Sequence, residues 1–170
     1  MQLHIVLVEP EIPQNTGNIA RTCAAVGAQL HLVKPMGFTI TDKHVKRAGL
    51  DYWHLVDLQY HNSLQEFLST VSAEHCVFAT TKGGKVYSDL PIGDVCYLVF
   101  GKETAGLPED LLRQYPHRAA RIPMRSEARS LNLSNAAAIM AYDALRRHDF
   151  PGLQCTTDTL SDDRRVSCSE

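Results

Sequence analysis

Residues 3–27 read LHIVLVEPEIPQNTGNIARTCAAVG. The apolar run at 3–8 predicts a strand that is buried on both faces of a sheet. The polar, proline-containing residues that follow predict a loop. From about Asn15, apolar residues recur at helical spacing until Gly27, a common residue just beyond a helix end; they are Ile19, Cys23 and Val26. A buried strand, a loop and an amphipathic helix in succession indicate an α/β protein.

The same alternation continues along the chain. Further strands are predicted at 29–33, 75–80, 95–100 and 119–122, and helices at 41–48, 63–71, 109–115 and 134–147. Ser63 and Glu66 form a capping-box pattern, and Ser134 is the predicted cap of the last helix. We therefore expect one α/β domain with a mainly parallel sheet over residues 1–152. Residues 153–170 are polar and lack periodicity, which predicts a disordered tail.

Composition narrows the class of protein. The chain has 170 residues, 44% hydrophobic and 21% charged, which suits one soluble domain. No window approaches the roughly 18 apolar residues of a membrane span, and the N-terminus lacks the basic region of a signal peptide. The five cysteines include no C-x-x-C pair, and no metal-ligand cluster is evident. These features predict a reduced, cytoplasmic protein without a membrane or metal partner.

The formal net charge of −2 gives weak evidence against a nucleic-acid partner, but the distribution of charge matters more. Basic residues cluster at Lys43, Lys46 and Arg47, and again at Arg118, Arg121, Arg125 and Arg129. Either cluster alone is most simply a solvated face.

Three loops follow predicted strands, where open α/β sheets bind ligands. In the first, Asn18 and Arg21 share one face of a helix start, so Arg21 could bind a phosphate or could be only a surface residue. In the second, Gly101 and Gly106 have the spacing of a P-loop, but Leu107-Pro108 replaces the required Lys-Ser/Thr. A glycine there allows close approach of a ligand or simply forms a tight turn.

The third loop gives the strongest signal. Ser130, Asn132, Ser134 and Asn135 fall within six residues and alternate with leucines just before a helix. One helix cap needs one such side chain, so four exceed what a cap explains.

Together the three loops resemble the three motifs of the SPOUT class of RNA 2′-O-ribose methyltransferases. The motifs are Asn15-Thr16-Gly17-Asn18-Ile19-Ala20-Arg21, Phe100-Gly101-Lys102-Glu103-Thr104-Ala105-Gly106-Leu107 and Ser130-Leu131-Asn132-Leu133-Ser134-Asn135. Within the class, the chain is similar to the minimal branch that methylates a cytidine or uridine derivative at position 34 of tRNA. The likeness extends over about residues 3–151, and it includes Glu9–Pro13, Lys34–Phe38, Arg47–Tyr52 and Thr80–Gly83.

The resemblance implies a deep trefoil knot within about residues 95–147, an exception to the usual rules of topology. It implies that S-adenosylmethionine binds in the knot, held mostly by main-chain groups of Ala79, Gly101, Ile122 and Ser130. Members act as homodimers whose active site uses both chains. Tyr142 is then a candidate interface residue, although simple core packing would also explain it.

The resemblance also assigns roles. Arg21 is the expected catalytic residue near the 2′-oxygen, and Ser130 and Asn132 are expected to orient it. Glu103 and Asn132 are expected to fix the positions of the three loops. Leu131 and Leu133 are expected to pack beneath these loops. A guanidinium stays protonated in proteins, so we favour Arg21 as an electrostatic clamp over a general base. Expected contacts to the anticodon arm of tRNA are Asn18, Lys43, Lys46, Arg47, Arg125 and Arg129.

Alternative functions stay open at this point. They are methylation of another RNA such as rRNA, an inactive RNA-binding module of the same class, and a flavodoxin-type nucleotide-binding protein. The missing phosphate-loop signature disfavours the last of these.

Overall fold

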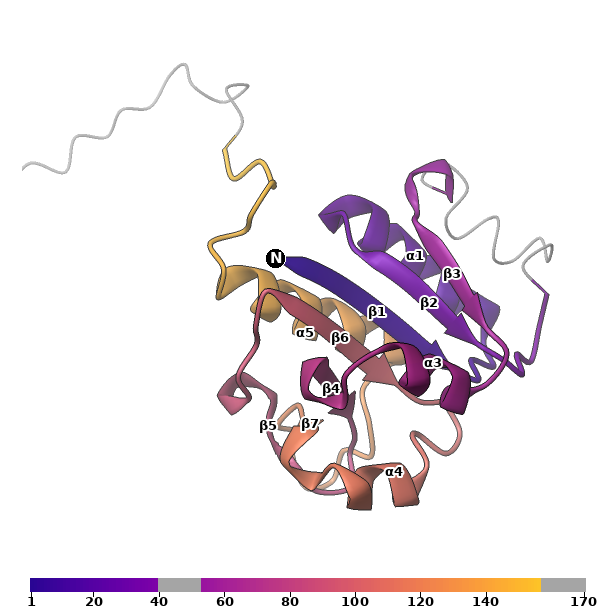
Figure 1. Cartoon of the computed structure of the whole chain (residues 1–170). Helices are drawn as coiled ribbons and strands as arrows, with labels where there is room; N and C mark the ends of the chain where they lie inside the picture. Colours follow the sequence, from indigo (N-terminus) through magenta and orange to yellow (C-terminus); the bar gives the residue numbers. More distant parts are fainter. Residues whose placement is uncertain (40–52, 157–170) are drawn as a thin grey trace, which may run out of the picture.

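A computed structural model describes residues 1–39 and 53–156 of the chain (Figure 1). The described residues form a seven-stranded sheet in the order β3-β2-β1-β6-β4-β7-β5, and every neighbouring pair is parallel. The strands are β1 (Gln2–Val8), β2 (Gln29–Val33), β3 (Leu58–His61), β4 (Cys76–Ala79), β5 (Lys85–Val86), β6 (Val95–Phe100) and β7 (Ala119–Arg121). The predicted α/β class with a parallel sheet is confirmed.

Helices cover both faces of this sheet (Figure 1). They are α1 (Pro13–Val26), α3 (Leu64–Thr70), α4 (Glu109–Gln114) and α5 (Leu133–Arg146), with short 3-10 turns η1 (Trp53–Leu55), η2 (Ala73–His75), η3 (Tyr87–Asp89) and η4 (Pro116–Arg118). The predicted helix at 41–48 and residues 157–170 of the predicted tail lie outside the described residues.

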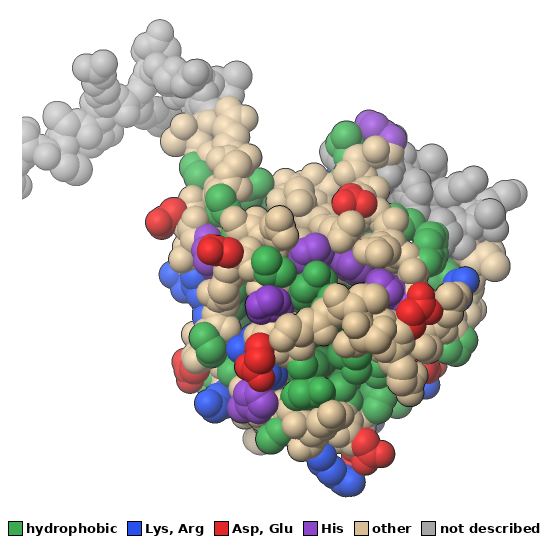
Figure 2. Space-filling view, viewed as in Figure 1, with side chains coloured by type: hydrophobic (Ala, Val, Ile, Leu, Met, Phe, Trp, Pro, Cys, Tyr) green, Lys and Arg blue, Asp and Glu red, His purple; other side chains and the backbone are tan. Residues whose placement is uncertain are grey.

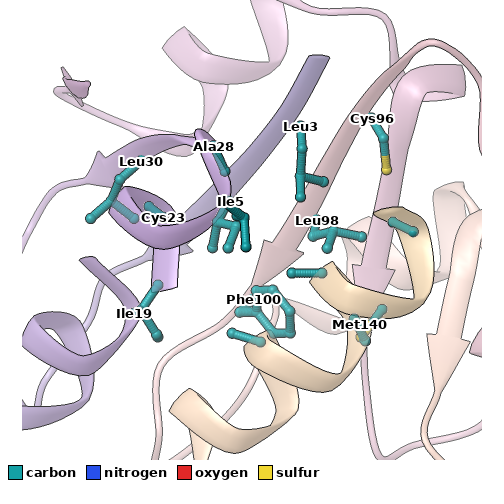
Figure 3. Packing of buried hydrophobic residues seen from close by; sticks show 14 of the residues in the cluster. Leu3, Ile5, Ile19, Cys23, Ala28, Leu30, Cys96, Leu98, Phe100 and Met140 are labelled. Atoms are coloured by element: carbon teal, nitrogen blue, oxygen red, sulfur yellow. The ribbon is translucent and has the colours of Figure 1, made fainter. Parts of the chain in front are cut away.

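The side chains of β1 point alternately to the two faces of the sheet, and they divide the core into two layers. Ile5 and Leu7 pack with α1 and α5 in one cluster, whereas Val6 and Val8 pack with Phe67 of α3 in the other. Figure 3 shows the first cluster, in which side chains from β1, β6, α1 and α5 converge. All four of these β1 side chains are buried, and each fully buried aliphatic side chain contributes about 1.5–3 kcal/mol. The prediction of a strand buried on both faces is therefore confirmed.

The observed ends of α1, α3 and α5 can be compared with the caps and stops that the sequence predicts. Gly27 ends α1 in the left-handed conformation, with φ 67°, and the Ser63 hydroxyl caps α3 by accepting from the N–H of Glu66. The prediction that Ser134 caps α5 is wrong. Helix α5 begins at Leu133, so the cap is Asn132, two residues before Ser134. The Oδ1 of Asn132 accepts from the N–H groups of Ser134 at 2.9 Å and Asn135 at 3.4 Å.

A hydrogen-bonded row of imidazole rings crosses the sheet face that bears α3. His4 Nδ1 lies 3.1 Å from His31 Nε2, and His31 Nδ1 lies 2.9 Å from His61 Nε2. Figure 2 shows histidine side chains gathered in the middle of this face. Burial lowers the pKa of all three rings, and that of His31 to about 3. We call His4, His31 and His61 the histidine row.

Candidate functional site

Because every strand runs the same way, the loops after β1, β4, β6 and β7 meet at one edge of the sheet. They enclose a pocket of about 490 Å³, within the usual size range of cofactor sites. The residues expected to hold the cofactor lie together there, as Ala79, Gly101, Ile122 and Ser130 all line the pocket. Asn132 and Arg129 also line it, and Leu107, Leu133 and Met140 contribute apolar surface.

Gly101 begins a tight hairpin after β6. The N–H of Gly106 donates to the carbonyl of Lys102 at 2.8 Å, and Gly106 has a φ of 73°. A Cβ added to Gly101 would lie 2.0 Å from the carbonyl carbon of Gly106 and 2.2 Å from the nitrogen of Leu107. The loop's own backbone therefore requires a glycine at 101, whatever ligand the pocket takes.

Two carboxylates hold this hairpin against the loop after β1 through hydrogen bonds. Glu103 accepts from the N–H of Glu11 at 2.9 Å and from that of Ile12 at 3.3 Å. Glu11 in turn accepts from the N–H of Thr104 at 3.1 Å and from its hydroxyl at 2.8 Å. Hydrogen bonds to ionised acceptors are the stronger kind, so the two loops are held as one unit. The expectation that Glu103 fixes the loops agrees with this geometry.

Asn15 extends the connection to the third loop. Its Nδ2 donates to Glu103 Oε1 at 3.0 Å, and its Oδ1 accepts from Asn132 Nδ2 at 3.0 Å. Asn15 is 5% exposed, and Asn132 also caps α5. We call Glu103, Asn15 and Asn132 the motif junction. The sequence placed Asn15 in the first motif without a role of its own, and its polar amide at the predicted helix start was the available signal.

A second, smaller cavity adjoins the first along the hairpin. Its volume is about 360 Å³, and it shares Lys82, Lys102 and the segment 105–107 with the larger pocket. Val8, Glu9, Pro108 and Glu109 complete its lining.

The charges around this cavity occur as two ion pairs. Lys102 Nζ lies 2.7 Å from Glu9 Oε2, and Lys82 Nζ lies 2.9 Å from Glu109 Oε1. The hydrogen bond from Lys102 to Glu9 raises the pKa of the ammonium, and the bond from Lys82 lowers the pKa of the Glu109 carboxyl. Glu9 has a φ of 51°, an uncommon value for a residue other than glycine.

Other candidate residues lie outside the larger pocket. Asn18 and Arg21 are on the exposed side of α1, and neither lines the pocket of its own chain. Arg125 is exposed on the loop after β7, and Tyr142 is 47% exposed on α5, so core packing does not explain it. The two leucines of the third loop, in contrast, both line the pocket; Leu133 also packs against the core, whereas Leu131 is 38% exposed. Lys43, Lys46 and Arg47 fall outside the described residues.

Among residues 1–39 and 53–156, no group of three or more histidine, cysteine or acidic side chains is placed to hold a metal ion. Over the same residues, no helix has the length and apolar character needed to cross a membrane. Cys23, Cys76 and Cys96 are buried thiols that lie within apolar stretches of the sequence.

Comparison with known proteins gives a consistent result. The SpoU rRNA Methylase family matches residues 2–142. A tRNA (cytidine(34)-2′-O)-methyltransferase of Methylovorus glucosotrophus is 47% identical over 149 residues, which cover 87% of this chain and 97% of that protein. A structure solved for 2-OH methylation of C/U34 on tRNA has a TM-score of 0.82 and 42% identity, covering 87% of this chain and 97% of the other. A SpoU methyltransferase from Streptomyces viridochromogenes, in complex with AdoMet, has a TM-score of 0.75 and 26% identity, covering 87% and 58%.

Proposed function

The chain belongs to the SpoU rRNA methylase family, and from this membership we propose that it transfers a methyl group from S-adenosylmethionine to a ribose 2′-hydroxyl of tRNA. The proposed target is nucleotide 34, a cytidine or uridine derivative, because relatives that match nearly end to end carry that activity. The observation that carries the proposal is the motif junction, which joins all three motif loops beside one pocket.

The residues present fit S-adenosylmethionine. The pocket combines apolar side chains, which suit an adenine ring, with backbone at the strand ends Ala79, Gly101 and Ile122 and in the loop at Ser130. The cofactor supplies an electrophilic methyl group on a positively charged sulfur. The protein's task is to hold the ribose oxygen in line with that methyl group, which is mainly positioning.

We propose Arg21 as the residue that stabilises the developing negative charge on the 2′-oxygen, with Ser130 and Asn132 positioned beside the reacting groups. A guanidinium keeps its proton at any physiological pH, so it suits an electrostatic role better than that of a base. Its planar fork can also bind the neighbouring phosphate at two points.

We propose that this role of Arg21 involves a second chain. Arg21 does not line the pocket of its own chain, which supports a site in which the partner's copy supplies the guanidinium. Helices α1 and α5 contact each other, and α5 exposes Ile139 and Tyr142 on its outer side. We propose a homodimer formed through this face, with Tyr142 in the interface.

The remaining proposals concern the RNA and the chain as a whole. Asn18, Arg125 and Arg129 are exposed and suit contacts to the phosphates of the anticodon arm, with Lys43, Lys46 and Arg47 as further candidates. We take residues 1–152 as the catalytic domain and residues 153–170 as an appended tail. The trefoil knot within residues 95–147 is part of the proposed fold. A tRNA-modifying enzyme of this kind would act in the cytoplasm.

The test is methylation by purified protein. Wild-type chain, S-adenosylmethionine and total tRNA from a strain lacking the gene should yield one ribose methyl group at nucleotide 34, mapped by mass spectrometry. An Arg21→Ala preparation serves as the negative control. Transfer to rRNA instead would support the alternative substrate, and cofactor binding without any transfer would indicate an inactive module.

A further inference from the structure

We propose that the smaller cavity, lined by Glu9 and Lys102, receives the base of the nucleotide whose ribose is methylated and reads its Watson–Crick edge. We call it the base pocket. The inference rests on the proposed function, because it assigns a further part of the same substrate to a site beside the cofactor pocket.

Position is the first argument. The cavity lies at the carboxyl ends of β1 and β6, where open parallel sheets bind ligands. The two cavities share a wall made by Lys82, Lys102 and the hairpin segment 105–107. A nucleotide whose ribose lies beside the cofactor must place its base within a few ångströms of that ribose. The adjoining cavity is therefore within reach of the base.

The charge of the lining is the second argument. Two lysines and two glutamates line the cavity, and each lysine is paired with a carboxylate, at 2.7 and 2.9 Å. The cavity thus carries no net charge, which makes it a poor site for a phosphate. An uncharged ligand with both donors and acceptors suits it better.

The Glu9–Lys102 pair presents both kinds of group side by side. A carboxylate only accepts hydrogen bonds, and an ammonium only donates them. Cytosine offers its 4-amino group to the carboxylate and its N3 or O2 to the ammonium. Uracil offers its N3–H to the carboxylate and O4 or O2 to the ammonium. The pair can therefore recognise either pyrimidine, and single-stranded RNA is commonly read at this edge.

The walls suit the flat faces of a base. Val8 and Leu107 are buried apolar residues, and Pro108 is exposed beside them. Apolar walls with a few placed polar groups are the usual composition of sites for small planar ligands. Both Glu9 and Lys102 keep about a third of their side-chain surface exposed, 35% and 36%, so their polar atoms remain accessible to an incoming ligand.

The experiment compares two tRNA substrates that differ only at nucleotide 34. One carries its base, and the other carries an abasic ribonucleotide that retains the 2′-hydroxyl. The enzyme variants are Lys102→Met, which keeps the aliphatic stem, and Glu9→Gln, which keeps the volume. Glu74→Gln is the matched control, because Glu74 pairs with His117 on the surface and lines neither cavity.

We expect Lys102→Met to lower kcat/KM for the intact tRNA about tenfold, the effect of one hydrogen bond to a charged group. For the abasic tRNA, the variant and the wild type should differ less than about twofold, because the group that Lys102 contacts is missing. Glu9→Gln should show a smaller loss with the same dependence on the base. Binding of S-adenosylmethionine by calorimetry should be unchanged in Glu9→Gln, because Glu9 lines only the smaller cavity, and both variants are assayed at saturating cofactor because Lys102 lines both cavities.

Equal losses on the intact and the abasic substrates would overturn the base pocket while leaving the proposed function in place. If the wild type methylates a nucleotide other than 34, the proposed target is wrong. The abasic substitution is then made at the methylated nucleotide, and the same comparison decides the base pocket. Absence of transfer to any RNA would overturn both proposals.

Discussion

Asn15 connects parts of the chain that are far apart in sequence. Its two bonds reach Glu103 and Asn132, which lie 88 and 117 positions away. The Asn15 amide offers its NH2 group as a donor to the Glu103 carboxylate and its oxygen as an acceptor to the Asn132 amide at the same time. The motif junction therefore depends on the chemical type of Asn15 more than on its size.

Asn15→Asp tests this dependence at constant volume. The new carboxylate would face Glu103 with no donor between them, in a buried position, so we expect a loss of about 1–3 kcal/mol in the free energy of unfolding. Affinity for S-adenosylmethionine should fall as well, because the loops lose their alignment. Urea denaturation and calorimetry give the two values. Asn18→Asp, on the exposed side of the same helix, is the control, and an equal loss of stability there would refute the junction.

Alanine substitutions at Gly101 and Gly93 test whether the hairpin backbone leaves room for a side chain at position 101. A Cβ at Gly101 would meet backbone at 2.0 Å, whereas a Cβ at Gly93 would meet nothing within 4 Å. Gly101→Ala should therefore force the hairpin open and lower both thermal stability and cofactor affinity. Gly93→Ala should change the unfolding free energy by no more than about 0.5 kcal/mol. Calorimetric melting curves measure both, and a fully stable Gly101→Ala protein would show that the hairpin can relax.

At the level of elements, the histidine row makes three neighbouring strands sensitive to acid. Burial lowers the pKa of His31 to about 3, and the pKa values of His4 and His61 are also lowered. An unfolded histidine has a pKa near 6.5, so below that pH the unfolded chain binds more protons than the folded one.

Stability should therefore be retained above about pH 6.5 and decrease as the pH falls from 6.5 toward 3. The loss should be on the order of a few kcal/mol. Chemical denaturation at a series of pH values measures the slope. His31→Phe keeps a ring against Phe67 and Tyr97 but removes the ionisable group, so its slope should be shallower than that of the wild type. Identical slopes would show that the row does not control acid stability.

Sequence patterns predicted the interior elements better than the edges. Strands β1, β2, β4, β6 and β7 are mostly apolar and were all predicted. Strands β3 and β5 were missed, because β3 is a polar edge strand that reads Leu58-Gln59-Tyr60-His61 and β5 has only two residues. An edge strand is solvated along one side and need not be uniformly apolar.

The sequence identified the loops of the pocket but not the side-chain hydrogen bonds between them. Glycines and polar residues after buried strands identified the loops, since strand ends converge in any parallel sheet. The bonds of Asn15 could not be predicted, because side-chain partners at a distance of about 100 residues depend on the final packing. The cap at Asn132 was missed for a smaller reason, a two-residue error in the position of the cap.

For the whole molecule, the proposed dimer predicts that two inactive chains can restore each other. Arg21→Ala keeps the pocket but lacks the guanidinium. Ala136→Trp fills the pocket, which Ala136 lines, but retains Arg21. In a mixed dimer, one of the two sites combines an open pocket with an intact Arg21.

Each variant alone should be nearly inactive. After subunit exchange in an equal mixture, about half of the dimers are mixed, and each mixed dimer has one functional site of its two. The mixture should therefore recover about a quarter of the wild-type rate. Methyl transfer to tRNA measures the recovery, and light scattering establishes the assembly. Mixed dimers without recovery would place Arg21 and the pocket of one chain in the same site.

The strand order also has a consequence for synthesis on the ribosome. One neighbour of β1 is β2, which ends at Val33 and is therefore synthesised early. The other neighbour of β1 is β6, which begins only at Val95. About 60 residues must be translated between β2 and β6, which takes on the order of 3–12 s at ordinary elongation rates. During that interval one edge of β1, a strand that is buried on both faces in the folded domain, has no partner strand from this chain. Such an edge can pair with another chain, so holdase chaperones should engage this protein before its second half emerges.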